Sequence, residues 1–531
     1  MQDSISPAIR WSLSSVALAF VVTVNAGTSE PAQVQGLGPW TTTPVFTIGE
    51  TVNGYTPPGI PDGMGAFERR KTVEILSNHE LRTTQGYPYT LANGTELTGA
   101  RVSKLVFDKK SRDLIDMGLA YDTIINRNGE PVSNTNPLEF GAGMNRLCSA
   151  GSFTKGQAGF VDDIFLTGEE SSGGTEFALD VQDGKLWAAP WMGRAAWESV
   201  AALEIPGLNR THVAILGGDD RGDAALLLYV GEKQRRGNFL ERNGLANGKL
   251  YMWVADNGDL SPADWNGNGT TRSGKFVEVE NYVDAIPAGE ESKYDELGFA
   301  TQAWLDEQRE SIGAFRFSRP EDLHTNPDNG NQVAFASTGR DTDINQGKDL
   351  WGTTYVVDMK INRGRIRNGN IEADITILYD GDDAINPDLG IRSPDNLVWA
   401  DDGYIYVQED RSISAFGTNG GGETSIWQLD PETGKAGPVG RVNRLAIPAE
   451  GYDIDPDDQG DWETSGIIDV TDEFNAKGER LMFFNVQAHS LRGTTIDANN
   501  LVEGGQFAFM SKPESKDKDD HKKGKKHRHD D

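Results

Sequence analysis

Short apolar runs that end in polar or acidic residues recur along the chain. A turn rich in Gly, Asp or Asn precedes each run, and this combination is typical of the strands of antiparallel sheets. The pattern therefore predicts an all-β protein. The segments that show it are 72–80, 161–170, 211–220, 329–339, 401–410 and 478–489.

These segments are unevenly spaced, which fits the blades of a β-propeller with insertions between them. The strands of a propeller converge on one axis, so the similar polar ends of the runs would meet at one mouth. We therefore predict a β-propeller over residues 35–511. A β-sandwich, or several small β domains, is the alternative interpretation.

Two stretches depart from the strand pattern. Around residues 255–312, apolar residues recur at helical spacing, which predicts an inserted, partly helical segment over one face of the fold. Segment 417–425, with the sequence GTNGGGETS, predicts a flexible loop near the mouth.

Both ends of the chain predict segments outside the fold. Residues 1–26 are typical of a signal peptide, with Arg10 before an apolar stretch and a small-x-small pattern that ends at Ala26. The stretch is too short and too interrupted for a membrane span, so we expect a periplasmic or secreted protein without membrane insertion. Residues 512–531 are densely charged and have no apolar anchor, which predicts a disordered tail.

The net charge of the chain limits the classes of partner that it can bind. There are 50 Lys and Arg against 81 Asp and Glu, which gives a formal net charge of −31 at pH 7. Such a field repels nucleic acid and anionic membrane surfaces, so we expect neither as a partner. It suits a protein that binds hard cations, and acidity for solubility alone is the alternative.

The polar strand ends supply candidate metal ligands. Glu169 and Glu170 are neighbours, so in a strand only one of them easily faces a given metal. Carboxylate and amide oxygens suit calcium, whereas a thiolate suits a transition metal. The alternative for any single acid is that it lies in a solvated turn or caps a strand end. The alternative for Cys148 is a buried, inert thiol. The further candidates are Glu80, Glu321, Asp395, Asn396, Glu409, Asp410, Glu463, Gln487 and His489.

Six motifs then follow one another along most of residues 45–510. They are Cys148-Ser149-Ala150-Gly151 with the Leu-Thr-Gly-Glu-Glu after it, Met-Gly-Arg-Ala-Ala-Trp-Glu-Ser around Glu198, Arg319-Pro320-Glu321, Pro394-Asp395-Asn396, Glu463-Thr464-Ser465-Gly466 and Asn485-Val486-Gln487-Ala488-His489. In this order they resemble motifs of the PhoX-type alkaline phosphatases, a family of secreted β-propeller enzymes that hold ferric iron and calcium.

The resemblance implies an exported alkaline phosphatase that hydrolyses small-molecule phosphate monoesters to inorganic phosphate, with Ca²⁺ and Fe³⁺ as cofactors. With the strand rhythm, it implies six blades, and we expect a monomer. Cys148 would be an iron ligand through its thiolate, and Arg319 would hold the phosphate oxygens. Arg319 and Glu321 would be the catalytic residues. The carboxylate and amide metal ligands would be Glu169, Glu198, Glu321, Asp395, Asn396, Glu409 and Glu463, with Glu169, Asp395 and Glu463 near calcium.

Some positions depart from the family pattern, and other functions stay open. Only Arg10 stands where several members carry a twin-arginine export signal, and Ala488 is inserted between Gln487 and His489. A calcium-dependent propeller hydrolase of other esters, lactones or phosphodiesters would not need Cys148. A non-catalytic propeller would bind a partner, with calcium as a structural ion.

Overall fold

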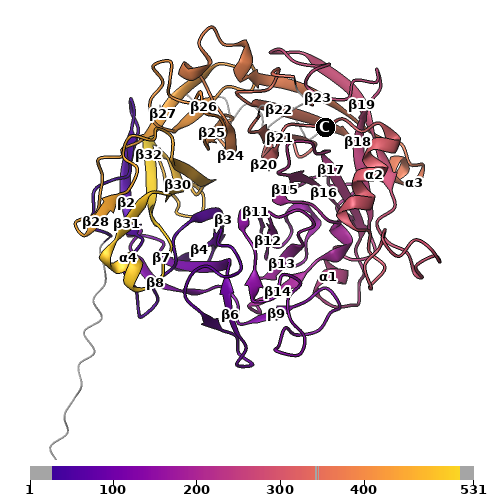
Figure 1. Ribbon diagram of the computed structural model, residues 1–531, viewed down its shortest axis with the longest axis horizontal. Coiled ribbons are helices and arrows are strands. Elements are labelled where there is room, and N and C mark those ends of the chain that lie inside the picture. The colour runs from indigo at the N-terminus through magenta and orange to yellow at the C-terminus, as the bar shows by residue number, and fades with distance from the viewer. Residues whose placement is uncertain (1–26, 341–343, 345, 515–531) are drawn as a thin grey trace, which may run out of the picture.

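The strands of this protein are arranged as a ring of sheets around a central axis (Figure 1). The structure is a computed structural model that describes residues 27–340, 344 and 346–514. The predicted signal peptide and residues 515–531 of the predicted tail lie outside the described residues. Within the described ranges, no helix is long and apolar enough to cross a membrane.

Six strands line the axis in the described part of the chain. They are β3 (Pro61–Glu68), β11 (Leu147–Phe153), β15 (Trp197–Ala202), β20 (Pro320–Thr325), β24 (Pro394–Trp399) and β29 (Trp462–Asp469). Each contacts the next, and β29 contacts β3, so the ring closes. The predicted all-β propeller is thereby confirmed. The number of blades stays a prediction, because two neighbouring sets of strands share one sheet through β19 (Thr271–Val279) and β23 (Ile371–Asp380).

From each innermost strand, antiparallel pairing continues outward to a second, a third and a fourth strand. The second strands are β4 (Thr72–His79), β12 (Ile164–Glu169), β16 (His212–Asp219), β21 (Gln332–Ser337), β25 (Ile405–Glu409) and β30 (Glu479–Ala488). The third strands are β7 (Arg101–Asp108), β13 (Glu176–Asp180), β17 (Leu227–Glu232), β22 (Thr353–Lys360), β26 (Ser425–Leu429) and β32 (Gly504–Pro513). The fourth strands are β8 (Leu114–Leu119), β14 (Lys185–Ala188), β18 (Lys249–Ala255), β23, β27 (Ala436–Val442) and β2 (Thr41–Thr47).

All six segments with the strand pattern contain second strands. The central part of each of these strands is largely apolar because each set of strands packs between two others, which buries both of its faces. In β16, Val213 and Ile215 pack against the preceding sheet, whereas Ala214 and Leu216 pack against the following one. Among the described residues, a hydrophobic cluster of this kind lies between each pair of neighbouring sheets. The core is therefore divided into layers around the axis.

Strands from the two ends of the described chain close the ring. The N-terminal β2 pairs with the C-terminal β32, with Thr42 opposite Met510, and β32 continues into β30 and β29. The short β1 (Val34–Gly36) extends the sheet before it by pairing with β27. The ring is thus held by backbone pairing and packing, since Cys148 is the single cysteine of the chain.

The remaining elements are short and lie in the connections. In the predicted insertion, β19 is followed by α2 (Gln302–Ile312), whose N-cap Thr301 accepts a hydrogen bond from the backbone of Trp304. Gly313, at φ 68°, ends this helix. The other elements are α1 (Phe239–Arg242), α3 (Arg363–Arg367), α4 (Thr494–Ala498), β5 (Tyr89–Thr90), β6 (Glu96–Gly99), β9 (Thr123–Ile125), β10 (Gly143–Met144), β28 (Gly451–Asp453), β31 (Leu491–Gly493) and four single-turn 3₁₀ helices at Gln157–Gly159, Pro190–Met192, Gly381–Asp383 and Pro387–Leu389.

Candidate active site

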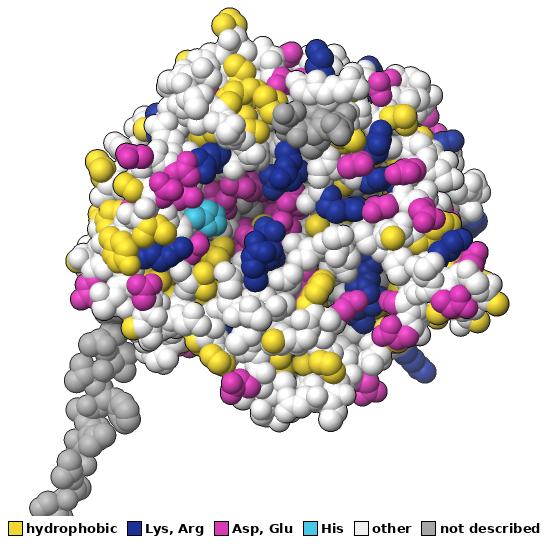
Figure 2. All heavy atoms as spheres, viewed as in Figure 1, with side chains coloured by type: hydrophobic (Ala, Val, Ile, Leu, Met, Phe, Trp, Pro, Cys, Tyr) yellow, Lys and Arg dark blue, Asp and Glu magenta, His cyan; other side chains and the backbone are white. Residues whose placement is uncertain are grey.

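One end of the central channel is acidic. Figure 2 shows Asp and Glu side chains gathered in a hollow at the centre of this face, with Lys, Arg and His side chains around it. The second residue of each innermost strand contributes to this end, and these residues form the inner ring: Asp62, Cys148, Glu198, Glu321, Asp395 and Glu463. The residue that directly follows each second strand lies beside them, and these residues form the outer ring: Glu80, Glu170, Asp220, Thr338, Asp410 and His489.

A β-bulge sits at the inner-ring position of five innermost strands. In β11, Leu147 pairs with Glu169 while Ala150 pairs with Thr167, so Cys148 and Ser149 together oppose one residue of β12. The same shift occurs at the start of β3, β15, β20 and β24, and in β29 it comes later in the strand. A bulge redirects a side chain that would otherwise follow the pleat. The repeated bulge therefore places a ligand-type side chain from several sheets at the same end of the axis.

The backbone is strained next to the same positions. Four innermost strands begin directly after a residue other than glycine with positive φ, at Ile60 (51°), Arg146 (52°), Arg319 (66°) and Ser393 (42°). Such a conformation costs roughly 1–2 kcal/mol for each residue and persists where the surrounding structure imposes it, often at a functional site. Its recurrence at one end of the propeller indicates a function there.

The two rings combine into four groups of possible metal ligands among the described residues. In each group the ligand atoms all lie within 4.8 Å of one another. Because neighbouring groups share Cys148, Glu198 or Asp395, they form one continuous row across the mouth. The groups are Asp62–Glu80–Cys148, Cys148–Glu170–Glu198, Glu198–Glu321–Asp395 and Asp395–Asp410–Glu463.

The electrostatics of this row fit bound cations. Burial, followed by repulsion from Glu321, raises the pKa of Glu198 well above its usual value, and burial with repulsion from Asp410 does the same for Asp395. Burial and the neighbouring Asp62 raise the pKa of the Cys148 thiol. The buried oxygens Glu198 Oε1 and Asp395 Oδ1 have no hydrogen-bond partner in the described part of the chain. Cations would relieve this repulsion and satisfy these oxygens, and a thiolate among carboxylates suits a transition metal beside harder ions.

Amide side chains hold the first residue of the row. Gln487 Nε2 donates to Asp62 Oδ2 at 2.8 Å, and Asn396 Nδ2 donates to Asp62 Oδ1 at 3.2 Å. The Cys148 thiol donates to Asp62 Oδ2 at 3.2 Å. Asn396, a predicted metal ligand, is thus a hydrogen-bond partner of Asp62, and its role as a ligand stays a prediction.

Arg319 lies beside the middle of the row. Its Nε and Nη2 donate to the two oxygens of Asp220 at 2.6 and 3.0 Å, and Nη2 also pairs with Glu321 Oε1 at 3.0 Å. Thr338 Oγ1 donates to the same Glu321 oxygen at 2.6 Å. Both residues predicted as catalytic, Arg319 and Glu321, are therefore in contact at the mouth.

The structure brings Cys148, Glu198, Glu321, Asp395 and Glu463 together as the sequence predicts, but not Glu169. Its neighbour Glu170 lies in the row instead. Glu169 accepts hydrogen bonds from the backbone N–H groups of Asn145, at 3.1 Å, and Thr175, at 3.3 Å. Neighbouring residues at a strand end point to opposite sides, which is why only one of this pair reaches the row.

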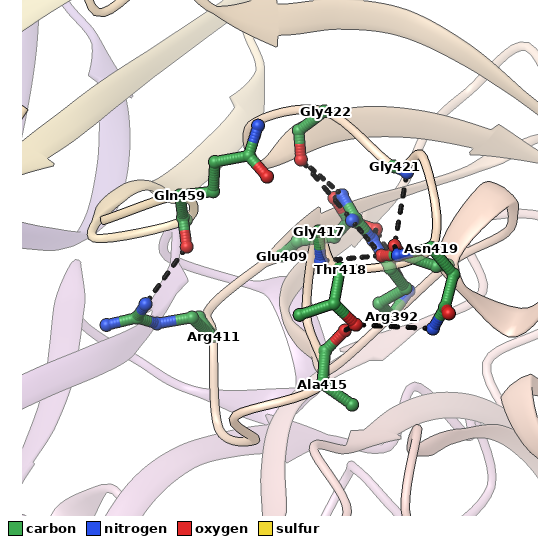
Figure 3. Close-up of polar contacts among 12 residues, drawn as sticks. Arg392, Glu409, Arg411, Ala415, Gly417, Thr418, Asn419, Gly421, Gly422 and Gln459 are labelled. Atoms are coloured by element: carbon green, nitrogen blue, oxygen red, sulfur yellow. Dashed lines mark hydrogen bonds and ion pairs between the residues drawn. The ribbon is translucent and has the colours of Figure 1, made fainter. Parts of the chain in front are cut away.

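Glu409 likewise lies outside the row, and Asp410 takes its place. The Glu409 carboxylate accepts hydrogen bonds from Arg392 Nε at 3.2 Å, Arg392 Nη2 at 3.1 Å and the backbone N–H of Ser425 at 2.9 Å. Figure 3 shows this pair beneath the glycine-rich loop. Since its oxygens are used in this way, Glu409 is a structural residue rather than a free ligand.

The loop predicted to be flexible, 417–425, is tied down by the same network. The buried Asp388 carboxylate accepts the backbone N–H groups of Gly417 and Asn419 at 2.7 Å and of Gly421 at 3.1 Å. Arg392 Nη1 donates to Asp388 at 2.6 Å, and its guanidinium lies 3.6 Å from the ring centre of Phe416. The loop thus wraps a buried ion pair.

Asp62 and Arg146 are among the residues at the mouth that the sequence analysis missed. Asp62 lies in an innermost strand that contains two glycines, Gly63 and Gly65, and so has no strong apolar run. Arg146 precedes Cys148 by two residues, the same spacing that separates Arg319 from Glu321. Comparing the residues that precede each inner-ring position would have singled it out.

A β-propeller whose mouth holds a row of carboxylates, one thiol and an adjacent arginine defines a metal-binding protein with the groups of a metallohydrolase. Residues 181–442 match the family model of the alkaline phosphatase PhoX, and this match indicates an alkaline phosphatase. No curated protein sequence matches it.

One solved structure supports the fold. PhoX of Pseudomonas fluorescens, in complex with the transition-state analogue vanadate, is 15% identical with a TM-score of 0.59, over 92% of this chain and 97% of that chain. The α-L-arabinofuranosidase PaAbf62A of Podospora anserina, in complex with cellotriose, covers 90% of this chain and 97% of that chain at 8% identity. Its TM-score of 0.30 is too low to indicate a shared fold.

Proposed function

We propose that this alkaline phosphatase acts outside the cytoplasm as a monomer and hydrolyses phosphate monoesters with iron and calcium held at the mouth. The observation that carries the proposal is the row of four linked ligand groups with the single thiol inside it and Arg319 beside it. The Pseudomonas fluorescens enzyme binds vanadate, a transition state analogue, which supports phosphoryl chemistry in this protein as well.

The donor types suggest how two kinds of metal would be divided along the row. Cys148 with Glu170 and Glu198 suits iron, because this group contains the one soft ligand. Asp395 with Asp410 and Glu463 offers only carboxylates and suits calcium. Cations bound here would neutralise the charge on the phosphoryl group as it is transferred.

Arg319 supplies the donor for the substrate in this proposal. Asp220 and Glu321 hold its Nε and Nη2, which fixes the plane of the guanidinium. Its Nη1 has no partner among the described residues and is not among the buried unpaired atoms, so it is open to a ligand. A charged donor fixed in this way can orient a phosphate oxygen.

Elemental analysis alongside a phosphatase assay tests the proposal. Purified protein is expected to contain iron and calcium and to hydrolyse p-nitrophenyl phosphate at alkaline pH. Cys148→Ser is expected to lower bound iron and activity together. A variant that keeps its hydrolytic activity would favour a calcium-dependent hydrolase that does not use the thiol. Absence of hydrolysis by the wild type with any metal would favour a binding propeller.

A further inference from the structure

The mouth holds a second arginine in the structural position of Arg319. Arg146 lies two residues before inner-ring Cys148, as Arg319 lies two residues before inner-ring Glu321. Each comes directly before an innermost strand, β11 or β20, and each has positive φ, 52° and 66°. The backbone therefore presents the two side chains from equivalent points of two sheets.

The two guanidinium groups also make equivalent contacts. Arg146 Nε donates to Glu80 Oε1 at 2.6 Å, and Arg146 Nη2 pairs with Glu170 Oε2 at 2.5 Å. As in Arg319, outer-ring carboxylates occupy Nε and Nη2 and leave Nη1 without a partner in the described ranges. Neither Nη1 is buried, and the Arg146 side chain is 33% exposed against 16% for Arg319. Both residues therefore keep one donor open to the mouth.

The two arginines flank one pair of carboxyl groups. Arg146 holds Glu170 and Arg319 holds Asp220. These two acids lie close together, since burial and then repulsion from neighbouring acids, Asp220 among them, raise the pKa of Glu170. Glu170 also belongs to the group with Cys148. A ligand bound over this part of the row would therefore have a guanidinium on either side.

We propose that Arg146 is a second phosphate-binding residue and that, with Arg319, it makes the site selective for monoesters over diesters. This inference rests on the proposed function. At alkaline pH a phosphate monoester carries two negative charges on three non-bridging oxygens, whereas a diester carries one charge on two such oxygens. Two cationic donors on opposite sides of the site match the two charges of the monoester. A diester offers these donors less charge and fewer non-bridging oxygens, so they bind it more weakly.

Arg146→Ala and Arg146→Gln test the inference, with Arg69→Ala as the matched control. Arg69 is 32% exposed and also bridges two acids of the first two sheets, Glu74 at 2.9 Å and Asp163 at 2.7 Å. It follows the other end of β3, away from the mouth. The control therefore removes an ion-pair bridge of the same kind without touching the site.

The Arg146 variants are expected to raise KM for p-nitrophenyl phosphate, and Ki for inorganic phosphate, roughly tenfold to a hundredfold, as for loss of a charged hydrogen bond. Values of kcat/KM for bis-p-nitrophenyl phosphate should fall less, so the ratio of monoester to diester activity should fall about tenfold. Inorganic phosphate should raise the Tm of the metal-loaded wild type and Arg69→Ala, but raise that of the Arg146 variants much less.

Several results would overturn the inference while leaving the proposed function intact. Wild-type KM and Ki in both Arg146 variants would do so, as would an unchanged preference for monoesters. If both variants fail to fold while Arg69→Ala folds, Arg146 has a structural role and the inference is wrong. If the wild type has no phosphatase activity with any metal, the proposed function itself fails.

Discussion

Replacing Glu409 tests whether this acid is structural while its neighbour Asp410 is the proposed metal ligand. Glu409 and Arg392 form an ion pair at 3.1 Å, and neither side chain is more than 2% exposed. Breaking a buried pair by removing one partner costs about 3–5 kcal/mol, and Glu409→Gln should lie near the lower limit because Arg392 keeps Asp388 at 2.6 Å. With an unfolding entropy of about 1 kcal/mol/K for a chain of 531 residues, Tm should fall by about 3 °C.

Asp410→Asn is the comparison, because Asp410 is the next residue and lies in the row with Asp395 and Glu463. It should lose bound calcium, while the Tm of the metal-free protein should change little, since the substitution removes repulsion among these acids. Glu409→Gln should keep its calcium. Differential scanning fluorimetry of both variants measures Tm, and elemental analysis measures their bound calcium. Calcium lost from Glu409→Gln and kept by Asp410→Asn would refute the assignment.

Three further outcomes are expected. Cys148→Ser should lower bound iron and leave bound calcium near the wild-type amount, by elemental analysis; equal loss of both metals would contradict the division of the row. Asp388→Asn should lower Tm at pH 7. Burial raises the pKa of Asp388, but hydrogen bonds from Arg392 and the loop amides outweigh burial, so this pKa is lowered overall. The stabilisation is therefore present above about pH 4 and is lost as the pH falls further. A Tm difference from the wild type that did not shrink as the pH was lowered below about 4 would be inconsistent with this. Phe107→Ala, which removes a ring packed on three aromatic neighbours, should cost about 3–5 kcal/mol in chemical denaturation without changing metal content.

The second strands could be predicted from the sequence because burial on both faces leaves a continuous apolar signal. β16 and β25 are examples, and their bounds lie within the predicted segments. The innermost strands carry a weaker signal, since each has an acidic residue or Cys148 in second place and each contains a bulge. β3, with the sequence PDGMGAFE, is such a strand, and Asp62 was missed with it.

The kind of site could be predicted from the sequence more readily than the exact residues that form it. The motifs pointed to Cys148, Glu198 and Glu321, which the structure brings to one mouth. Choosing between Glu169 and Glu170 requires knowledge of which side a strand end faces, and this depends on the bulge opposite it. Arg146 was missed because its likeness to Arg319 becomes visible only when the residues that precede each inner-ring position are compared.

The central claim is that cations held by this row of acidic residues and Cys148 carry out phosphate ester hydrolysis. The most direct measurement is the hydrolysis of p-nitrophenyl phosphate by the purified protein before metal removal, after it, and after iron and calcium are restored. Activity should be present at alkaline pH, disappear with the metals and return when both are added. Full activity in protein shown by elemental analysis to be free of metal would contradict the account.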